Sequence, residues 1–269
     1  MLALLVERFS PQFGWLAIVG VLIGVFLIRY IAFAGSALAL VTLFRTPLKH
    51  RRLQPQPFSR DQLMREGLYS LLTMLIFGLV GMGAYTLQAH FGIYQIYNDI
   101  DAHGWLWLFA SIPTALLVHD FYFYWAHRFM HLPGIYQRVH KVHHLSTNPS
   151  PLAAFAFHPL EAVIEALGFV VILVVVPLHP VAFFAVSTLM ITYNVMGHLG
   201  YELLPHGLPD KPVAGLMNTA TSHNQHHRTY RYNYGLYTLI WDHLFGTFHP
   251  RYAETYADAT QPENSQITA

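Results

Sequence analysis

The sequence contains no cysteine and few charged residues. Without cysteine, the chain forms no disulfide, no thiolate zinc site and no cysteine-ligated iron–sulfur cluster. Charged residues make up 11% of the 269 residues and hydrophobic residues 54%, whereas about a quarter of an ordinary soluble domain is charged. The net charge of +1 indicates no polyanionic partner such as nucleic acid. This composition predicts a protein that lies in a lipid membrane.

The N-terminus lacks the pattern of a cleavable signal peptide. Glu7 and Arg8 lie within the first ten residues, and the apolar stretch that follows is much longer than a signal-peptide core. We therefore expect this stretch to be retained as a membrane segment.

Apolar runs recur along the chain, and a transmembrane helix needs about 20 mostly apolar residues. The runs cover residues 13–44, 67–88, 105–125, 162–176 and 181–196. The first run is long enough for one tilted span or for a span followed by an interfacial helix. The last two are short and separated by Pro177 and Pro180, which predicts a tight turn or a shallow hairpin.

These runs predict an all-α fold, a bundle of four or more membrane helices. We expect residues 1–251 to form a single domain, with the site-bearing core at 105–250. Residues 252–269 are polar without an apolar period, which predicts a disordered tail.

The basic residues are distributed unevenly between the connections. Of the 15 lysines and arginines, 13 lie in 45–65, 128–141 and 211–251, whereas 89–104 and 177–180 contain none. Basic connections are typical of the cytoplasmic side of a membrane. The pattern therefore predicts that 127–150 and 198–251 meet on the cytoplasmic side as a helical cap.

Histidine is the most unusual residue, with 18 copies. Three motifs, HRFMH, HKVHH and HNQHH, contain eight of them: His127, His131, His140, His143, His144, His223, His226 and His227. Spacings of three and four residues place side chains on one face of a helix. One such motif arises by chance in a histidine-rich chain, but three on one membrane side indicate a site. Without a metal, buried imidazole nitrogens would stay unpaired at a cost of about 1–3 kcal/mol each.

Eight imidazoles exceed what one ion needs, because four suffice for zinc and six fill an octahedron. The motifs therefore predict two metal ions, each with about four ligands and an open position. Imidazole suits zinc, copper, iron and nickel, so the ligand type does not choose the metal.

His198 and His119 are further candidate ligands. His198 ends the last apolar run, level with the motifs. His119 lies two turns before His127, beside Asp120, and an ionisable pair within a span indicates function. The alternative for His119 is a hydrogen-bonded pair between packed helices.

Four residues are candidates for orienting a ligand imidazole through its second nitrogen. They are Asp120, His158, Glu161 and Asp242. His158 and Glu161, in the FHPLE segment, are alternatively expected to face a substrate.

At these motifs the sequence resembles the sterol desaturase/fatty acid hydroxylase superfamily of membrane di-iron oxygenases. The matching text is HDFYFYWAHRFMH and IYQRVHKVHHLSTNPSPLAAFAFHPLE within 119–161, and NTATSHNQHHRTYRYNYGLYTLIWDHLFGTF at 218–248. HKVHH followed by a proline and FHP, together with the NYG and WD segment, looks most like the C-5 sterol desaturase branch. The first 100 residues match only in apolar character.

The resemblance implies that the eight motif histidines bind two non-haem iron ions, with His198 where members often have a further ligand. It also implies O2 as co-substrate, electrons from cytochrome b5, ferredoxin or a reductase, and hydroxylation or desaturation of an alkyl C–H bond in a sterol or fatty acyl lipid. Zinc has no redox chemistry, so iron is favoured for such a reaction. Arg228 and residues 232–235 are a candidate docking face for the donor. The implied location is the bacterial inner membrane or the endoplasmic reticulum.

Two other classes of protein stay open as alternatives. A divalent-metal transporter places its ligands near the middle of the membrane, whereas most of these histidines lie outside the apolar runs. A metal hydrolase would want a carboxylate beside its ligands, as in H-E-x-x-H, and no histidine motif here contains one.

Overall fold

The computed structural model describes residues 2–261, with side chains from Gly14 onward, and contains no strand in that range. The α-helices are α1 (Leu2–Tyr30), α2 (Ser36–Leu43), α3 (Arg60–Phe91), α4 (Gly104–Met130), α5 (Ile135–Val139), α6 (Lys141–His144), α7 (Pro159–Val175), α8 (Pro180–Gly197), α9 (Ala220–Thr229), α10 (Ile240–Leu244) and α11 (Tyr252–Thr260). The predicted all-α class is confirmed.

Within the described residues, four helices are long and apolar enough to cross a membrane. They cover Gly14–Leu43, Arg60–Phe91, Gly104–Met130 and Pro180–Gly197. A π-helical turn, Ile31–Gly35, joins α1 to α2. The long first apolar run therefore forms one continuous helical segment. Helix α7 has 17 residues and is joined to α8 by a short connection at Pro177, where the sequence predicts a tight turn.

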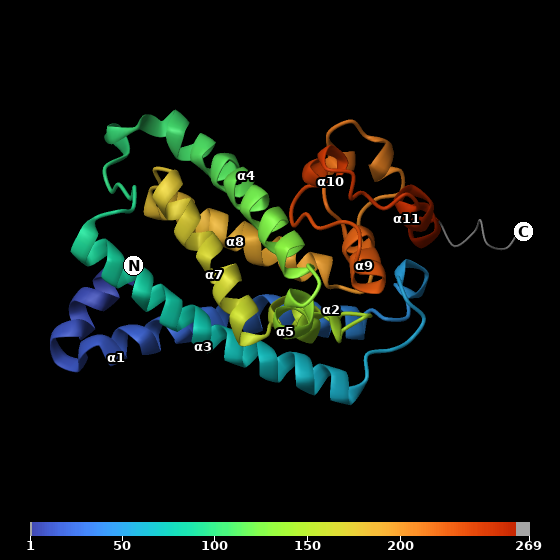
Figure 1. Ribbon diagram of the computed structural model, residues 1–269, viewed down its shortest axis with the longest axis horizontal. Helices are drawn as coiled ribbons and strands as arrows, with labels where there is room; N and C mark the ends of the chain where they lie inside the picture. The colour runs from blue at the N-terminus through green and yellow to red at the C-terminus, as the bar shows by residue number, and fades with distance from the viewer. Residues whose placement is uncertain (1, 262–269) are drawn as a thin grey trace, which may run out of the picture.

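The long helices pack against one another along most of their length. Helix α3 contacts α1 and α7, while α4 crosses α7 and α8 (Figure 1). Buried apolar side chains of α4, α7 and α8, among them Ala115, Ile172 and Val186, form the largest core cluster. Small residues let the helix backbones approach, as at Gly78, where an added Cβ would lie 2.4 Å from Ile23.

The connections gather at two opposite ends of the bundle. At one end the segment after α3 bonds to the α7–α8 turn, with Leu178 N donating to Gln95 O at 2.9 Å. At the other end the first basic connection reaches the cap, where Gln54 donates to Asn224 at 2.9 Å and Arg51 to the Leu204 carbonyl at 2.7 Å. The basic-rich connections therefore share one end with both histidine-rich segments.

The C-terminal cap is formed by α9, α10 and α11, drawn in orange and red beyond the ends of α4 and α8 (Figure 1). The prediction of a disordered tail from residue 252 is wrong for residues 252–261, which form α11 and the residue after it. Tyr252 and Tyr256 lie one turn apart and are fully buried against Leu239, so two aromatic rings anchor a helix whose other residues are polar or small. Residues 262–269 of the predicted tail lie outside the described residues.

Candidate metal centre

Nine histidines gather into two adjacent groups at the capped end of the bundle. The first group is His127, His131, His140, His144 and His226, and the second is His143, His198, His223 and His227. Within each group, one ring nitrogen of every residue lies within 4.8 Å of the corresponding nitrogens of the others. All nine residues are buried except His131, which is partly exposed. The structure thus brings together the eight motif histidines and His198.

The two H-x-x-H-H motifs divide their histidines between the groups in opposite ways. In HKVHH the outer pair, His140 and His144, belongs to the first group, and His143 belongs to the second. In HNQHH the outer pair, His223 and His227, belongs to the second group, and His226 belongs to the first. Residues four apart share a helix face, whereas neighbours are turned by about 100°. Each motif therefore serves both groups at once.

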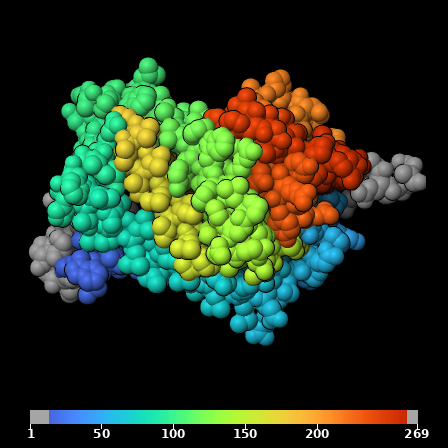
Figure 2. All heavy atoms as spheres, viewed as in Figure 1, coloured from blue at the N-terminus to red at the C-terminus, as the bar shows by residue number. Residues whose placement is uncertain are grey.

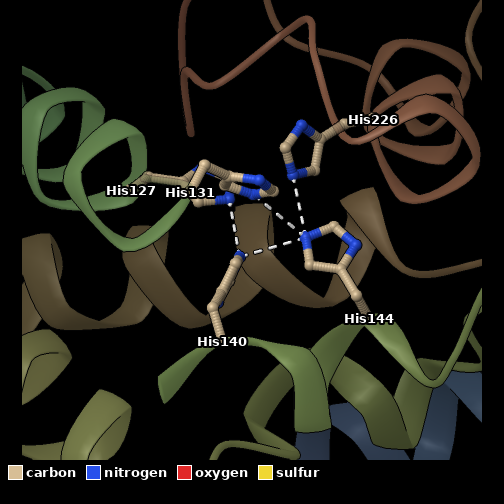
Figure 3. Close-up of side chains that lie close together, drawn as sticks. All are labelled: His127, His131, His140, His144 and His226. Atoms are coloured by element: carbon tan, nitrogen blue, oxygen red, sulfur yellow. Dashed lines mark hydrogen bonds between the residues drawn. The ribbon is translucent and has the colours of Figure 1, made fainter. Parts of the chain in front are cut away.

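His144 is at the centre of the first group. Its Nε2 lies 3.0 Å from Nε2 of His140, 3.1 Å from that of His226 and 3.2 Å from that of His131. Nε2 of His127 is 3.1 Å from that of His140. Figure 3 shows the five rings pointing toward one another from three separate segments, with dashed lines at the close approaches.

The second group has the same spacing between its nitrogens. Nε2 of His223 lies 3.0 Å from that of His198 and 3.1 Å from that of His227. Nε2 of His198 is 3.4 Å from that of His143. Two nitrogens that bind one ion at right angles, each about 2.1 Å from it, would be about 3.0 Å apart. The spacing in both groups therefore fits shared ligation of a metal ion.

Backbone carbonyls identify which ring nitrogens carry protons. His127 Nδ1 lies 2.9 Å from the Tyr234 carbonyl, and His226 Nδ1 lies 2.6 Å from the Tyr232 carbonyl. A carbonyl only accepts, so each Nδ1 must donate, and in a neutral imidazole the Nε2 then carries a lone pair. In the second group His198 Nδ1 is fixed in the same way by the Asn194 carbonyl at 2.7 Å.

Lone pairs therefore converge in both groups. His144 Nε2 faces three other Nε2 atoms but carries at most one proton, so the remaining approaches cannot be hydrogen bonds. Nδ1 of His223 and of His227 has no hydrogen-bond partner among the described residues. A bound cation relieves this repulsion, because every converging lone pair then becomes a ligand. The residues present fit two metal ions, one in each group.

Burial keeps these imidazoles neutral. Burial, followed by the neighbouring histidines, lowers the pKa of the ring well below its ordinary value at six positions, namely His140, His143, His144, His223, His226 and His227. Burial lowers the pKa of His198 to about 4. Because neutral imidazole is the ligating form, the site is ready for a metal at neutral pH.

Glu161 contacts one candidate ligand, His140, from the position where the sequence suggests a carboxylate that orients an imidazole. Its Oε1 lies 2.6 Å from His140 Nδ1, and both side chains are buried. A carboxylate on the far nitrogen fixes the ring and raises its basicity as a ligand. Asp242 acts one step further away, because it accepts from the backbone of Tyr234 and Gly235 and so holds the carbonyl that anchors His127.

Asp120 does not contact a ligand imidazole, which is the role that the sequence predicts for it. Its two oxygens accept from the backbone of Leu236 and Tyr237 and from the side chains of Thr238 and Trp241, at 2.6–3.2 Å. These four donors satisfy a buried carboxylate in the second half of α4 and hold the segment that follows α9 in place. Asp120 therefore shapes the site through the loop.

His119 lies outside both groups, contrary to the expectation of a ligand. Its Nδ1 is 2.9 Å from the Tyr237 hydroxyl, and its ring fills the space beside Gly168, where an added Cβ would lie 2.6 Å from Nε2. Its surroundings are those of a packed, hydrogen-bonded helix contact. His158 also differs, since it caps α7 and accepts from Leu160 N at 3.3 Å.

Some positioning residues carry no signal in the sequence. Glu202 is buried and accepts from the backbone and hydroxyl of Thr221 at 3.0 and 2.7 Å, which fixes the first turn of α9. The side chains of Thr219 and Ser222 close a capping box at the same helix end. Glu202 is an isolated acid after α8, and the only hint in the sequence is its place near His198.

Two small cavities border the centre on its membrane side. One is lined by Phe123 and Phe157, by Glu165 and Asn194, and by histidines of both groups. The other extends from His198 and His223 toward Tyr193 and Leu236. The second group contributes to both cavities, and the first group contributes His127 and His140 to the cavity beside Phe123 and Phe157.

The chain belongs to the fatty acid hydroxylase family, whose sequence model matches residues 112–247. This segment contains all nine histidines of the two groups.

Among curated proteins, the chain is similar to sterol-modifying enzymes of the C-5 desaturase branch. It is 30% identical to mouse lathosterol oxidase over 204 residues, which are 75% of this chain and 66% of the relative. The human lathosterol oxidase is 27% identical over 74% of this chain and 65% of its own length. The Delta(7)-sterol 5(6)-desaturase of Schizosaccharomyces pombe is 29% identical over 71% and 61%. The chain thus spans about two thirds or less of the length of these relatives. No solved structure matches it.

Proposed function

We propose that the protein is an O2-dependent di-iron enzyme that desaturates or hydroxylates an alkyl C–H bond of a membrane lipid. The observation that carries the proposal is the convergence of unprotonated imidazole nitrogens in two adjacent groups. The family match and the sterol-oxidising relatives support the lipid chemistry.

The nine histidines would hold the two ions, with five donors in the first group and four in the second. When bound, iron supplies the redox chemistry with O2 that breaks an unactivated C–H bond, which zinc does not. His140 would be held in its ligating orientation by Glu161, and His127 by the Tyr234 carbonyl.

The chain's own residues would place the lipid and exclude water. Phe123 and Phe157 give the cavity beneath the histidines an apolar wall, and both are buried. An alkyl group there lies beside histidines of both groups. The cavity lies between α4, α7 and α8, which contribute Phe123, Glu165 and Asn194, so we expect a lipid to reach it from the membrane.

The reaction also needs electrons from outside the chain. In desaturation, two hydrogens leave neighbouring carbons, and two electrons with two protons complete the reduction of O2 to two waters. In hydroxylation, one oxygen atom enters the C–H bond and the other becomes water. We propose cytochrome b5, a ferredoxin or a reductase as donor, on the cytoplasmic face of the bacterial inner membrane or the endoplasmic reticulum. The shared location of the basic connections supports that side.

The test is turnover by purified protein in lipid nanodiscs, supplied with reductant, O2 and either a Δ7-sterol or a fatty acyl lipid. We expect two irons per chain and a product that has lost two hydrogens or gained one oxygen. His143→Ala should abolish the product, while His90→Ala, at an exposed position remote from the centre, should not. One zinc per chain and no oxidised lipid would instead support a hydrolase or a transporter and overturn the proposal.

A further inference from the structure

Two tyrosines cover the first histidine group on its outer side. The ring of Tyr136 lies 5.4 Å from that of His131 and 5.7 Å from that of His144. The ring of Tyr230 lies 4.9 Å from that of His144 and 6.0 Å from Tyr136. Both tyrosines are partly exposed, whereas His144 beneath them is buried. The two rings therefore cover part of the first group.

Tyr230 takes a backbone conformation that an aromatic residue seldom adopts. It ends α9 with φ of +61°, in the left-handed region, where glycine or asparagine is usual. Its amide donates to the His226 carbonyl at 2.8 Å, so the strained residue directly follows the helix that bears three candidate ligands, His223, His226 and His227. The strained backbone turns the Tyr230 ring back onto His144.

Unpaired positive charge surrounds these tyrosines. Arg138 and Lys141 follow Tyr136, Arg228 and Arg231 flank Tyr230, and all four side chains are exposed. Residues 121–160 and 211–241 contain no aspartate or glutamate. No ion pair within the described residues involves any of the four. Figure 2 shows the yellow-green surface around α5 beside the orange surface of α9, so the two halves of this patch adjoin.

We propose that this tyrosine patch, made of Tyr136, Tyr230, Arg138, Lys141, Arg228 and Arg231, is the docking surface for an acidic electron-transfer protein. The inference rests on the proposed function, because the oxidation consumes two electrons that the substrate does not supply. The first group lies beneath Tyr136 and Tyr230 and includes the partly exposed His131, so it is the group that an external protein can approach. Charge complementarity favours an acidic partner.

The patch differs from the docking face that the sequence suggests. Arg228 belongs to both, but Asn233, Tyr234 and Gly235 are buried, since their backbone and side chains hold the loop against Asp242 and α9. A partner therefore meets Tyr136 and Tyr230 and not the loop behind them.

The experiment uses an acidic [2Fe–2S] ferredoxin as the probe and the iron-loaded protein in zwitterionic nanodiscs. Binding is measured at several salt concentrations, and electron transfer from reduced ferredoxin is followed anaerobically by stopped flow. The variants are Arg138→Glu with Lys141→Glu, and Arg228→Glu with Arg231→Glu. The matched control is Arg45→Glu with Lys211→Glu, which makes the same charge change at exposed positions outside the patch.

We expect each patch variant to slow the bimolecular electron transfer about tenfold or more at low salt, with the difference vanishing at high salt. Reduction by dithionite and the iron content should stay at the wild-type level, and Tyr136→Leu should slow electron transfer while preserving binding. Equal losses in the control, or unchanged rates in both patch variants, would overturn the docking proposal. So would binding of the patch to phosphatidylserine vesicles in place of ferredoxin. If the protein holds no reducible iron, the proposed function is wrong. The ferredoxin-binding measurement then still tests the docking proposal separately.

Discussion

The two histidine groups have the same nitrogen spacing but different surroundings. In the first group, His127, His140 and His226 each have a protein partner on the far ring nitrogen. In the second, Nδ1 of His198 lies 2.7 Å from the Asn194 carbonyl, while Nδ1 of His223 and His227 has no hydrogen-bond partner among the described residues. The first group lies beneath surface tyrosines and borders one cavity through His127 and His140, whereas the second group borders both cavities. We therefore expect the two groups to have different roles in one reaction. The oriented ligands of the first group would lie toward the electron donor, and the less constrained ligands of the second group would lie toward the substrate.

The largest expected effect comes from removing a central ligand of either group. We expect His144→Ala to lose the first metal and His223→Ala the second, each reducing lipid oxidation to below about 1% of wild type, since even outer partners of ligands are worth 10–100-fold. Metal analysis and product formation give the readout, with His90→Ala as control. If either variant kept both metals, the division into two groups would be wrong.

A smaller effect on metal affinity is expected when a candidate ligand remains but loses the hydrogen-bond partner of its second ring nitrogen. Glu161→Ala removes the carboxylate from His140 and should weaken the first metal about 10–100-fold while sparing the second. Glu161→Gln should restore part of the loss, because an amide oxygen still accepts from Nδ1. Competition titration with a chelator measures both variants. Equal weakening of the two metals would contradict the distinction between the groups.

Chelation of the wild-type protein should separate the groups by rate. With fewer oriented imidazoles, the second group is expected to release its metal several-fold faster than the first. Rapid-quench metal analysis on wild type and on His144→Ala, which retains only the second metal, would assign the phases. Release in a single phase would show that the outer partners do not matter.

The smallest effect concerns the stability of the metal-free protein. A buried imidazole with a lowered pKa binds its proton mainly after unfolding, so stability is full above about pH 6.5 and falls as the pH decreases toward the folded pKa. For His198, with a pKa of about 4, the loss from about pH 7 to about pH 5 is about 2 kcal/mol, at 1.36 kcal/mol per pKa unit. Thermal unfolding of the apoprotein and of a His198→Asn variant measures it. A pH-independent difference between them would exclude this contribution.

Sequence spacing was sufficient to find the histidines but not to sort them. The spacing of H-x-x-H-H predicts three imidazoles on one helix face. The division of each motif between the two groups depends instead on how α6 and α9 face each other. Hydrophobic runs likewise predict the spans, because length and apolar content decide whether a helix can cross a membrane.

The residues whose roles were predicted incorrectly have one feature in common: each contacts a partner that is distant in the sequence. His119 meets Tyr237, and Asp120 meets the backbone of Leu236, both more than 110 residues away. Tyr252 and Tyr256 order α11 because they pack on Leu239. No local sequence pattern encodes such contacts. The sequence therefore indicates a functional polar pair at His119 and Asp120 and a disordered tail from residue 252.

The central claim is that the nine histidines hold two metal ions, one in each group. Diffraction data from iron-loaded crystals, collected on both sides of the iron absorption edge, test it most directly. The account predicts two anomalous peaks, one among His127, His131, His140, His144 and His226 and one among His143, His198, His223 and His227. A single peak, or a peak outside these groups, would contradict it.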